Sequence, residues 1–365
     1  MKVEVLQEQL LVGLNIVERA VATRAQLPAL SHILIEAKSE GLVLSATDLE
    51  IGIKTKVTAK VVGVGVVAVP AKIFGEFLSS LNPGKIELRL EKETLILSAP
   101  GYSGKFQTIN IDEFPAIPDI EKEMGICTVE AGLFTTTVER VVFASARDSL
   151  RPVLTGVLLE FGKKRMKLVA TDGFRLAVEE LAVETKVEQL TLLVPSRVVS
   201  EVIRLAGEEQ IRIGHLSATN QIYFLVGDTQ IVSQLLSGNF PDYQKILPKE
   251  FTTEVEVNRD ELLSAIRAVH IFARDNSNMM RWQIEKDKLI LSSSSPERGE
   301  CKVEVLIKLT GEGLEIIFNA KYVLDYLSIV TGEVLWVGMG NRLAPGMIRD
   351  TSRESGRYVV MPINA

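Results

Sequence analysis

Two stretches decide the fold: PALSHILIEAKSEGLVLSATD at residues 28–48 and PVLTGVLLEFGKKRMKLVATD at residues 152–172. They align without a gap, share 8 identities in 21 positions and lie 124 residues apart. A repeat of this period is long enough for each copy to hold its own hydrophobic core, whereas solenoid units are only about 20–50 residues long. The sequence therefore predicts repeated domains rather than a solenoid.

A second repeated segment occurs three times with apolar residues at i, i+1, i+4 and i+5, a spacing typical of one buried helix face. The three copies are VPAKIFGEFLSSL (69–81), VPSRVVSEVIRLA (194–206) and FNAKYVLDYLSIV (318–330). Each repeat also opens with another apolar helical stretch, at 10–24, 133–147 and 262–274. Each repeat is therefore predicted to contain two helices.

Alternating runs rich in Val, Ile and Leu, such as those at 42–62, 86–99 and 252–258, indicate antiparallel strands. Charged segments that contain proline separate the repeats near 115–127 and 241–251. We predict an α+β chain of three domains, each with two helices packed on antiparallel sheets. Their expected bounds are 1–120, 128–247 and 250–365.

The composition is that of a folded protein without a membrane span. The chain has 365 residues, 46% hydrophobic and 24% charged, and no apolar run approaches the ~18 residues of a membrane helix. Its N-terminus, MKVEVLQEQLL, carries glutamates where a signal peptide needs an apolar core. Two cysteines, Cys127 and Cys301, are too few for a disulfide framework. We expect a cytoplasmic protein.

Motifs of catalysis are missing from the sequence. There is no GxxxxGK[ST], GxSxG, HExxH or CxxC, and the three histidines fall in different repeats. Asp48 and Asp172 recur in the repeated Ala-Thr-Asp segment, so one alternative is a metal- or carboxylate-dependent hydrolase that uses both. A repeated Thr-Asp after a strand is more typical of turn and capping chemistry. We expect no enzyme activity, no metal and no cofactor.

The charge distribution matters more than the total. A net charge of −6 would ordinarily argue against nucleic acid. The six helical segments with their ends, however, taken as 6–24, 71–81, 131–147, 196–207, 258–274 and 320–330, carry 11 basic and 8 acidic residues. Their charge is therefore +3, and that of the remainder is −9. Lys72, Arg197 and Lys321 occupy the same position in the three copies, and Arg19, Arg140 and Arg267 lie on the other helices. The repetition predicts a shared basic surface.

The chain resembles the bacterial DNA polymerase III beta subunit family, the sliding clamps, over essentially its whole length. The resemblance rests on the order and spacing of several motifs. They are LPALSHILIEA (27–37), LSATDLEIGI (44–53), DEFPAIP (112–118), VATDGFRLAV (169–178), GNFPDYQKILP (238–248) and YVVMPI (358–363).

The resemblance implies a DNA clamp fold in which a head-to-tail homodimer forms a closed ring of six domains. Helices would line the hole, and the ring would encircle double-stranded DNA without sequence specificity and tether the replicative polymerase. Its implied partners are the DNA polymerase III alpha subunit, the clamp loader, and other DNA polymerases and repair proteins, in the bacterial cytoplasm and at the nucleoid during replication. The DNA-contact candidates are Arg24, Lys72, Arg147, Arg151, Arg197 and Lys321.

The family's pocket for a short partner peptide also maps onto this sequence. The implied residues are Leu154, Thr171, Gly173, Phe174, Arg175, Leu176, Pro241, Lys245, Ile246, Val359, Met361, Pro362 and Ile363, with Arg175 orienting the peptide. For each aliphatic residue taken alone, core packing is the alternative. The implied dimer contacts are Phe106, on the strand at 102–109, and Ile271 and Phe272 near a helix end.

The sequence departs from the family pattern at three places. Phe174 stands where members often carry His, and Lys245-Ile246 replace a frequent Arg-Val. The chain ends Ile363-Asn364-Ala365, where many members end in Met, a basic residue and Leu. These changes leave open an alternative function, a clamp paralogue that confers resistance to clamp-directed inhibitors.

Overall fold

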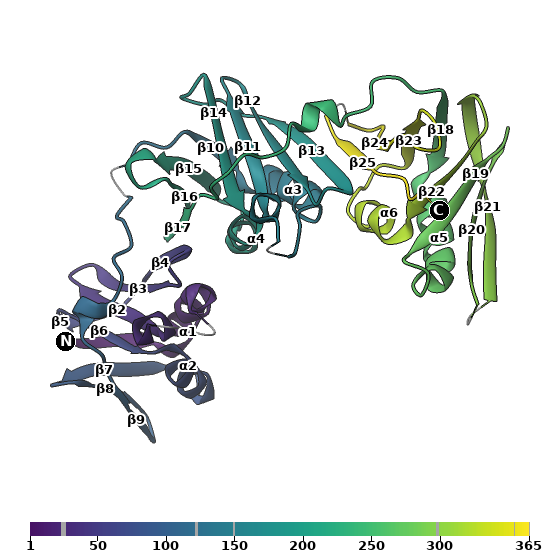
Figure 1. Ribbon diagram of the computed structural model, residues 1–365. Helices are drawn as coiled ribbons and strands as arrows, with labels where there is room; N and C mark the ends of the chain where they lie inside the picture. The colour runs from purple at the N-terminus through teal and green to yellow at the C-terminus, as the bar shows by residue number, and fades with distance from the viewer. Residues whose placement is uncertain (23–26, 121–122, 149, 297–298, 354, 365) are drawn as a thin grey trace. The chain divides into compact units, whose positions relative to one another are not determined.

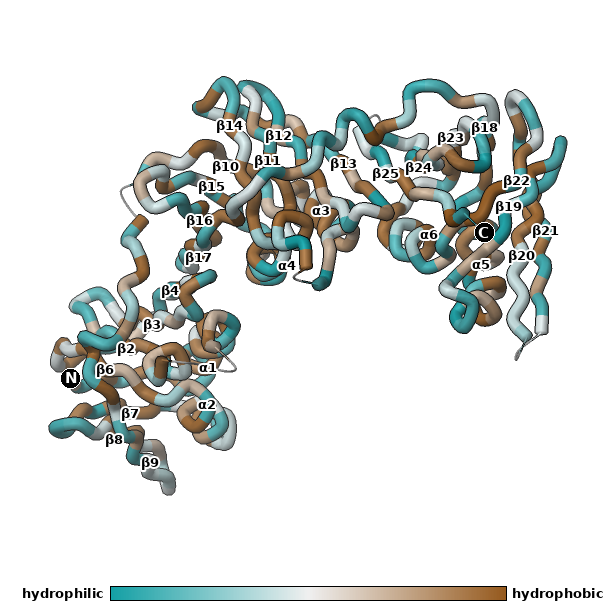
Figure 2. Tube along the Cα trace, viewed as in Figure 1, coloured by the Kyte–Doolittle hydropathy of each residue, from teal (hydrophilic) through white to brown (hydrophobic). Residues whose placement is uncertain are grey.

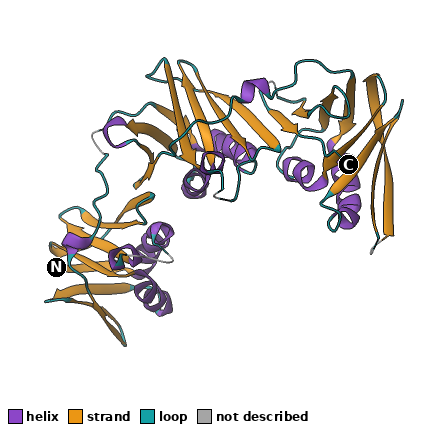
Figure 3. Ribbon diagram, in the orientation of Figure 1, coloured by secondary structure: helices purple, strands orange, loops and turns teal. Residues whose placement is uncertain are grey.

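The computed structural model describes residues 1–22, 27–120, 123–148, 150–296, 299–353 and 355–364. This part of the chain forms six α-helices and three antiparallel sheets, which confirms the predicted α+β class (Figure 3). The helices fall where the repeat predicts them. They are α1 (Gln7–Val17), α2 (Ala71–Ser80), α3 (Ala131–Val142), α4 (Ser196–Leu205), α5 (Arg259–Ala273) and α6 (Ala320–Leu327).

The chain divides into two compact units, one of Met1–Gly132 with Ser200–Leu235 and one of Leu133–Val199 with Leu236–Ala365. The boundary between the two units runs through the middle repeat, because strands of this repeat pair with strands of the first repeat and with strands of the third. The expected domain bounds at 1–120, 128–247 and 250–365 therefore stay predictions about the sequence repeat.

The first unit contains two sheets (Figure 1). The five-stranded sheet has the order β5 (Lys60–Gly63), β1 (Lys2–Leu6), β7 (Lys85–Glu91), β8 (Thr94–Ala99), β9 (Tyr102–Gln107). The eight-stranded sheet has the order β10 (Cys127–Glu130), β15 (Gln210–Leu216), β16 (Gln221–Val226), β17 (Thr229–Gln234), β4 (Ile51–Val57), β3 (Gly41–Thr47), β2 (His32–Lys38), β6 (Gly65–Pro70).

The second unit contains one twelve-stranded sheet. Its first half has the order β14 (Gln189–Pro195), β11 (Gly156–Gly162), β12 (Arg165–Thr171), β13 (Arg175–Ala182), β25 (Arg357–Val360), β24 (Gly346–Asp350). The order continues with β23 (Val334–Met339), β18 (Thr253–Asn258), β21 (Gly299–Gly311), β20 (Lys288–Ser295), β19 (Met279–Ile284), β22 (Leu314–Asn319). Helix α5 packs on β20 and β21 and also contacts α6.

In each of two sheets, one strand pair joins strands from different repeats. In the eight-stranded sheet β4 pairs with β17, and the hydroxyls of Thr55 and Thr229 lie 2.8 Å apart across that pair. In the twelve-stranded sheet β13 pairs with β25, where Leu176 faces Val359. Both pairs extend the backbone hydrogen bonding from one repeat into the next.

Burial follows the predicted pattern at most apolar positions of the repeated helices. Phe74, Leu78, Val198 and Val202 are fully or almost fully buried, whereas Ile73, the first of the repeated apolar positions in its helix, is 61% exposed. Hydrophobic and hydrophilic residues are interspersed along the helices and strands (Figure 2). In the first unit α1 packs so closely that a Cβ on Gly13 would lie 2.4 Å from Val57 Cγ2, which explains a glycine inside this helix. No helix among the described residues is long and apolar enough to cross a membrane.

Candidate functional site

The repeated Thr-Asp forms the same turn in both units. Thr171 Oγ1 donates to the carbonyl of Arg175 and accepts from the Gly173 amide, while Asp172 Oδ1 accepts from the amides of Phe174 and Arg175. Thr47 and Asp48 make the four corresponding bonds in the β3–β4 turn. The carboxylates thus organise backbone amides, as the interpretation of turn chemistry predicts.

The β12–β13 turn contains a residue in the left-handed backbone conformation. Gly173 has φ of +94°, a conformation that glycine adopts without steric cost. Leu49 occupies the corresponding place in the other turn with φ of 78°. The next residue, Phe174, projects from the turn with 61% of its surface exposed. An exposed phenylalanine on a rigid turn is a candidate contact for an apolar partner.

Arg175 holds this turn against two helices rather than facing solvent. Its Nε donates to Asp172 Oδ2 at 2.9 Å, its Nη1 to Asp325 Oδ2 at 2.7 Å and its Nη2 to the Phe143 carbonyl at 2.8 Å. The guanidinium also lies 4.6 Å from the centre of the Tyr322 ring. Each of the three guanidinium nitrogens thus makes a hydrogen bond within the chain, so Arg175 positions the turn. Two of its five N–H groups are not used by these bonds, and its expected role of orienting a peptide stays a prediction.

The charge of Arg175 is maintained despite its burial. Burial by itself disfavours the cation, but Tyr358 and the carboxylates of Asp325 and Asp172 outweigh it and raise the pKa of Arg175. The guanidinium therefore remains a fixed cation at any pH at which the protein is folded.

A cavity of about 580 Å³ opens beside the turn. Leu154, Phe174 and Arg175 of the expected peptide pocket line it. The complete lining adds Ser145, Ala146, Arg147, Asp148, Leu150, Arg151, Asp172, Lys321 and Tyr322. A size of this order and a mixed apolar and cationic wall suit a short peptide.

Other expected pocket residues belong to a buried cluster or to the surface. Leu176 and Val359 are 1% exposed and lie in a hydrophobic cluster against which Ile246 packs, while Thr171 is 2% exposed. Pro241 and Lys245 are exposed, and Lys245 pairs with Asp242 at 2.9 Å. The half-buried C-terminal segment is fixed by its backbone: the amide of Met361 donates to Phe174, and that of Ile363 to Ile317, with Pro362 between them.

The expected DNA contacts fall in three groups. Arg24 lies outside the described residues. Lys72 and Arg197 are exposed at matching places in the first turns of α2 and α4. Arg147, Arg151 and Lys321 line the cavity beside Phe174, and Lys321 pairs with Asp325 at 2.9 Å. Three residues that the sequence assigns to DNA contact therefore line the candidate peptide pocket, and their role in DNA contact stays a prediction.

Two arginines expected on the basic surface are ion-paired instead. Arg140 is 5% exposed and lies 3.8 Å from Glu179 and 3.9 Å from Asp350, so it contributes no charge to a solvent-facing surface. Arg19 pairs with Glu201 at 3.3 Å. An arginine on a helix cannot be assigned to the exposed face from its position in a repeat alone.

The expected dimer residues lie on an edge strand and on a helix end. Phe106 is on β9, which is the last strand of its sheet, and its ring packs edge-on against Phe74 and Phe77 at centroid distances of 5.1 and 5.6 Å. It is 6% exposed, so it belongs to the core of its own unit in this chain. Ile271 is 50% exposed and Phe272 is half-buried.

Two residues of the site were missed in the sequence. Tyr322 and Asp325 on α6 hold the guanidinium of Arg175. The sequence identifies Tyr322 only as an apolar position of the repeated helix, and Asp325 only as one of the eight acidic residues counted in the helical segments. Their spacing of three residues on one helix indicates that both side chains lie on the same face, but it does not identify the arginine that they contact.

The comparisons with known proteins agree across the whole chain. Models of the DNA polymerase III beta subunit match it as N-terminal domain at 1–118, central domain at 128–242 and C-terminal domain at 244–364. The beta sliding clamp of Chlamydia muridarum is 30% identical over 95% of this chain and 94% of its own length. That of Synechococcus elongatus is 30% identical over 100% and 99%.

Solved structures show the same fold. The DNA polymerase III beta subunit of Thermotoga maritima has a TM-score of 0.91 at 31% identity, covering 100% of this chain and 99% of that one. The DNA polymerase sliding clamp of Bacillus subtilis has a TM-score of 0.95 at 25% identity with the same coverage. The architecture is thus the sliding clamp fold with three domains. The chain belongs to the DNA polymerase III beta subunit family, the beta sliding clamps.

Proposed function

We propose that the chain forms a ring-shaped homodimer that encircles duplex DNA and tethers a replicative DNA polymerase without catalysing a reaction. The observation that carries this proposal is the full-length match to the family. Ring closure by topology needs only weak, sequence-independent attraction to phosphates, and exposed Lys72 and Arg197 at matching helix positions supply cations of this kind. Its place of action would be the bacterial cytoplasm, at the nucleoid during replication.

The proposal that the ring is held on DNA by encircling it is tested by comparing circular DNA with linear DNA. The protein should run at twice its monomer mass and, once loaded, stay on nicked circular DNA but leave it after linearisation. Equal retention on both forms of DNA would overturn the ring proposal. Binding of the free chain to either form should weaken steeply as salt rises, because the contacts are electrostatic.

For the cavity beside Phe174 we propose the role of docking site for a short partner peptide. Support comes from the exposed Phe174, the aliphatic wall at Leu154 and the cations Arg147 and Arg151. Such peptides would come from the DNA polymerase III alpha subunit, the clamp loader, or other polymerases and repair proteins.

The docking proposal is tested by anisotropy with a labelled peptide from the alpha subunit of the same organism. Phe174→Ala should weaken binding at least about tenfold, because a large exposed anchor is lost. Leu343→Ala is the matched control, since Leu343 is 62% exposed in the same unit and does not line the cavity. Equal affinities of both variants would contradict the assignment.

A second candidate is a clamp paralogue that confers resistance to clamp-directed inhibitors. Phe174 favours it, since an apolar ring on the rim replaces the His that family members often carry. Phe174→His should then restore inhibitor binding while alpha-peptide binding persists. The hydrolase alternative loses its support, because Asp48 and Asp172 each accept two backbone hydrogen bonds within a turn.

A further inference from the structure

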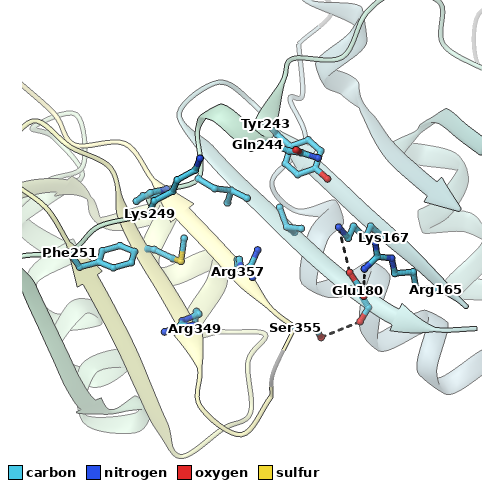
Figure 4. A pocket seen from close by; sticks show the side chains of 14 residues that line it. Arg165, Lys167, Glu180, Tyr243, Gln244, Lys249, Phe251, Arg349, Ser355 and Arg357 are labelled. Carbon is cyan, nitrogen blue, oxygen red and sulfur yellow. Dashed lines mark hydrogen bonds and ion pairs between the residues drawn. The ribbon is translucent and has the colours of Figure 1, made fainter. Parts of the chain in front are cut away.

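A second cavity, of about 810 Å³, lies on one face of the twelve-stranded sheet (Figure 4). It crosses β12, β13, β25 and β24 and is bounded by the connecting segment at 243–251. We call it the basic groove and define it by its charged lining: Arg165, Lys167, Glu180, Lys249, Arg349 and Arg357. None of these residues belongs to the cavity beside Phe174.

The strand register places these charges on one face. Lys167 pairs with Glu180 across β12 and β13, and Val178, two residues before Glu180, pairs with Arg357 on β25. Because side chains alternate between faces, Glu180, Val178 and Arg357 share a side of the sheet. Figure 4 shows Arg165, Lys167 and Glu180 on one side of the cavity and Lys249 and Arg349 on the other, with Arg357 between them.

The groove has an excess of positive charge. Its lining holds five cations and one carboxylate, and Glu180 already pairs with Arg165 at 3.5 Å and with Lys167 at 3.6 Å. Among the described residues, no carboxylate forms an ion pair with Lys249, Arg349 or Arg357. Adjacent like charges are unfavourable in isolation, so an anionic ligand would relieve an existing repulsion.

Two of the groove's walls are held rigidly before any ligand arrives. The guanidinium of Arg349 lies 3.9 Å from the centre of the Trp336 ring, and Trp336 Nε1 donates to Glu254 at 2.8 Å. On the other side, the hydroxyl of Tyr243 donates to Glu160 at 2.7 Å and fixes the connecting segment. Pre-organised cations lose less entropy when they bind.

The base of the groove is apolar. Val178 and Met347 are buried there, and Leu247 and Phe251 close it from the connecting segment. A ligand that fills the groove therefore needs carboxylates for the walls and aliphatic groups for the base. An acidic peptide that also carries apolar side chains has both.

Single-stranded nucleic acid fits the groove less well, because its bases need open aromatic faces. The Tyr243 ring is 5% exposed, Phe251 packs edge-on against Trp336 at 4.9 Å, and Arg349 covers the Trp336 face. Each of the three rings is thus already buried or in contact with another side chain.

We propose that the basic groove binds an acidic segment of a partner protein in which carboxylates alternate with apolar residues. Val178, Met347 and Tyr243 belong to the same hydrophobic cluster as Leu176 and Val359 of the expected peptide pocket. The groove assignment itself does not depend on the proposed clamp function, because it rests on the charges and register of this unit alone.

The test uses the full-length protein and a labelled peptide in which Glu alternates with Leu. The double variant Arg349→Gln/Arg357→Gln should weaken its binding at least about tenfold, since two charge-assisted contacts are removed. The matched control is Arg281→Gln/Lys302→Gln, which removes the same charge from β19 and β21 of the same unit. The control should bind the peptide as the unchanged protein does.

Further comparisons separate the groove from its alternatives. The same peptide with Gln in place of Glu should lose affinity, and rising salt should weaken the Glu peptide. Phe174→Ala should leave Glu-peptide binding unchanged, so that failure of the groove and failure of the peptide pocket are distinguishable. Equal losses in both double variants, equal binding of the Gln peptide, or tighter binding of oligothymidine or inorganic phosphate through the same arginines would overturn the proposal.

Discussion

Arg175 and Asp325 share a hydrogen bond of 2.7 Å that ties the β12–β13 turn to helix α6. The bond joins residues 150 positions apart, and it fixes the turn from which Phe174 projects. The guanidinium continues to Asp172 and to the Phe143 carbonyl, so one side chain connects a turn, a helix end and a second helix. The hydrogen bonds of the neighbouring Arg175 thus fix the backbone position of the exposed Phe174.

Replacing Arg175 should loosen this turn. Arg175→Met leaves two partly buried carboxylates and a carbonyl without their donor, so we expect a loss of about 2–4 kcal/mol in the free energy of unfolding. Urea denaturation measures it, with Lys321→Met as control, because the exposed pair of Lys321 with Asp325 should contribute less than about 1 kcal/mol. Equal losses in the two variants would contradict the role given to Arg175.

The buried ion cluster around Arg140 makes a second prediction. Arg140→Met places Glu179 and Asp350, 3% and 2% exposed, side by side without that cation, and should cost about 3–5 kcal/mol of stability. Arg281→Met is the control, because the Arg281–Glu315 pair is about half exposed and should contribute less than about 1 kcal/mol. If both variants unfold at the same urea concentration, the cluster does not stabilise the fold.

Tyr243 gives a prediction about alkaline pH. Burial first, and then the hydrogen bond to Glu160, raise the pKa of Tyr243 to about 12, against about 10 in an unfolded chain. Since the folded-state pKa is the higher one, the stabilisation is complete below about pH 10 and is lost as the pH rises towards 12. Tyr243→Phe should lower the free energy of unfolding by about 1–2 kcal/mol at neutral pH.

The pH profile provides the check on Tyr243. The difference in free energy of unfolding between the unchanged protein and Tyr243→Phe should shrink as the pH is raised from about 10 to 12. Urea denaturation at each pH measures this difference. A difference that is constant over this range would show that the hydroxyl is not the source of the stabilisation.

The two cysteines should differ in reactivity. Cys127 is buried on β10, and burial raises the pKa of its thiol to about 11, so almost no thiolate is present at neutral pH. Cys301 is half-buried on β21. Titration with a thiol reagent should therefore label Cys301 in the native protein and Cys127 only after unfolding in urea. Rapid labelling of both in the native state would contradict this.

The six helices could be predicted from sequence because their apolar periodicity is local and repeated three times. The pairing of β4 with β17 could not be predicted, since it joins residues 174 to 182 positions apart and depends on how whole repeats meet. The same limit explains the site. Phe174 and Leu154 could be assigned to the pocket by resemblance, but the guanidinium partners of Arg175 and the burial of Arg140 depend on contacts between distant segments.

The pairing of β4 with β17 also constrains how this chain can be divided. A fragment that ends at the first sequence repeat would keep β4 but lose its neighbour, leaving a row of unpaired amides and carbonyls open to other chains. The middle repeat, isolated, would expose such edges at both β17 and β13. Three copies in the sequence are therefore not three separable proteins. The bounds of the two compact units offer no better cut, because they fall inside helices α3 and α4.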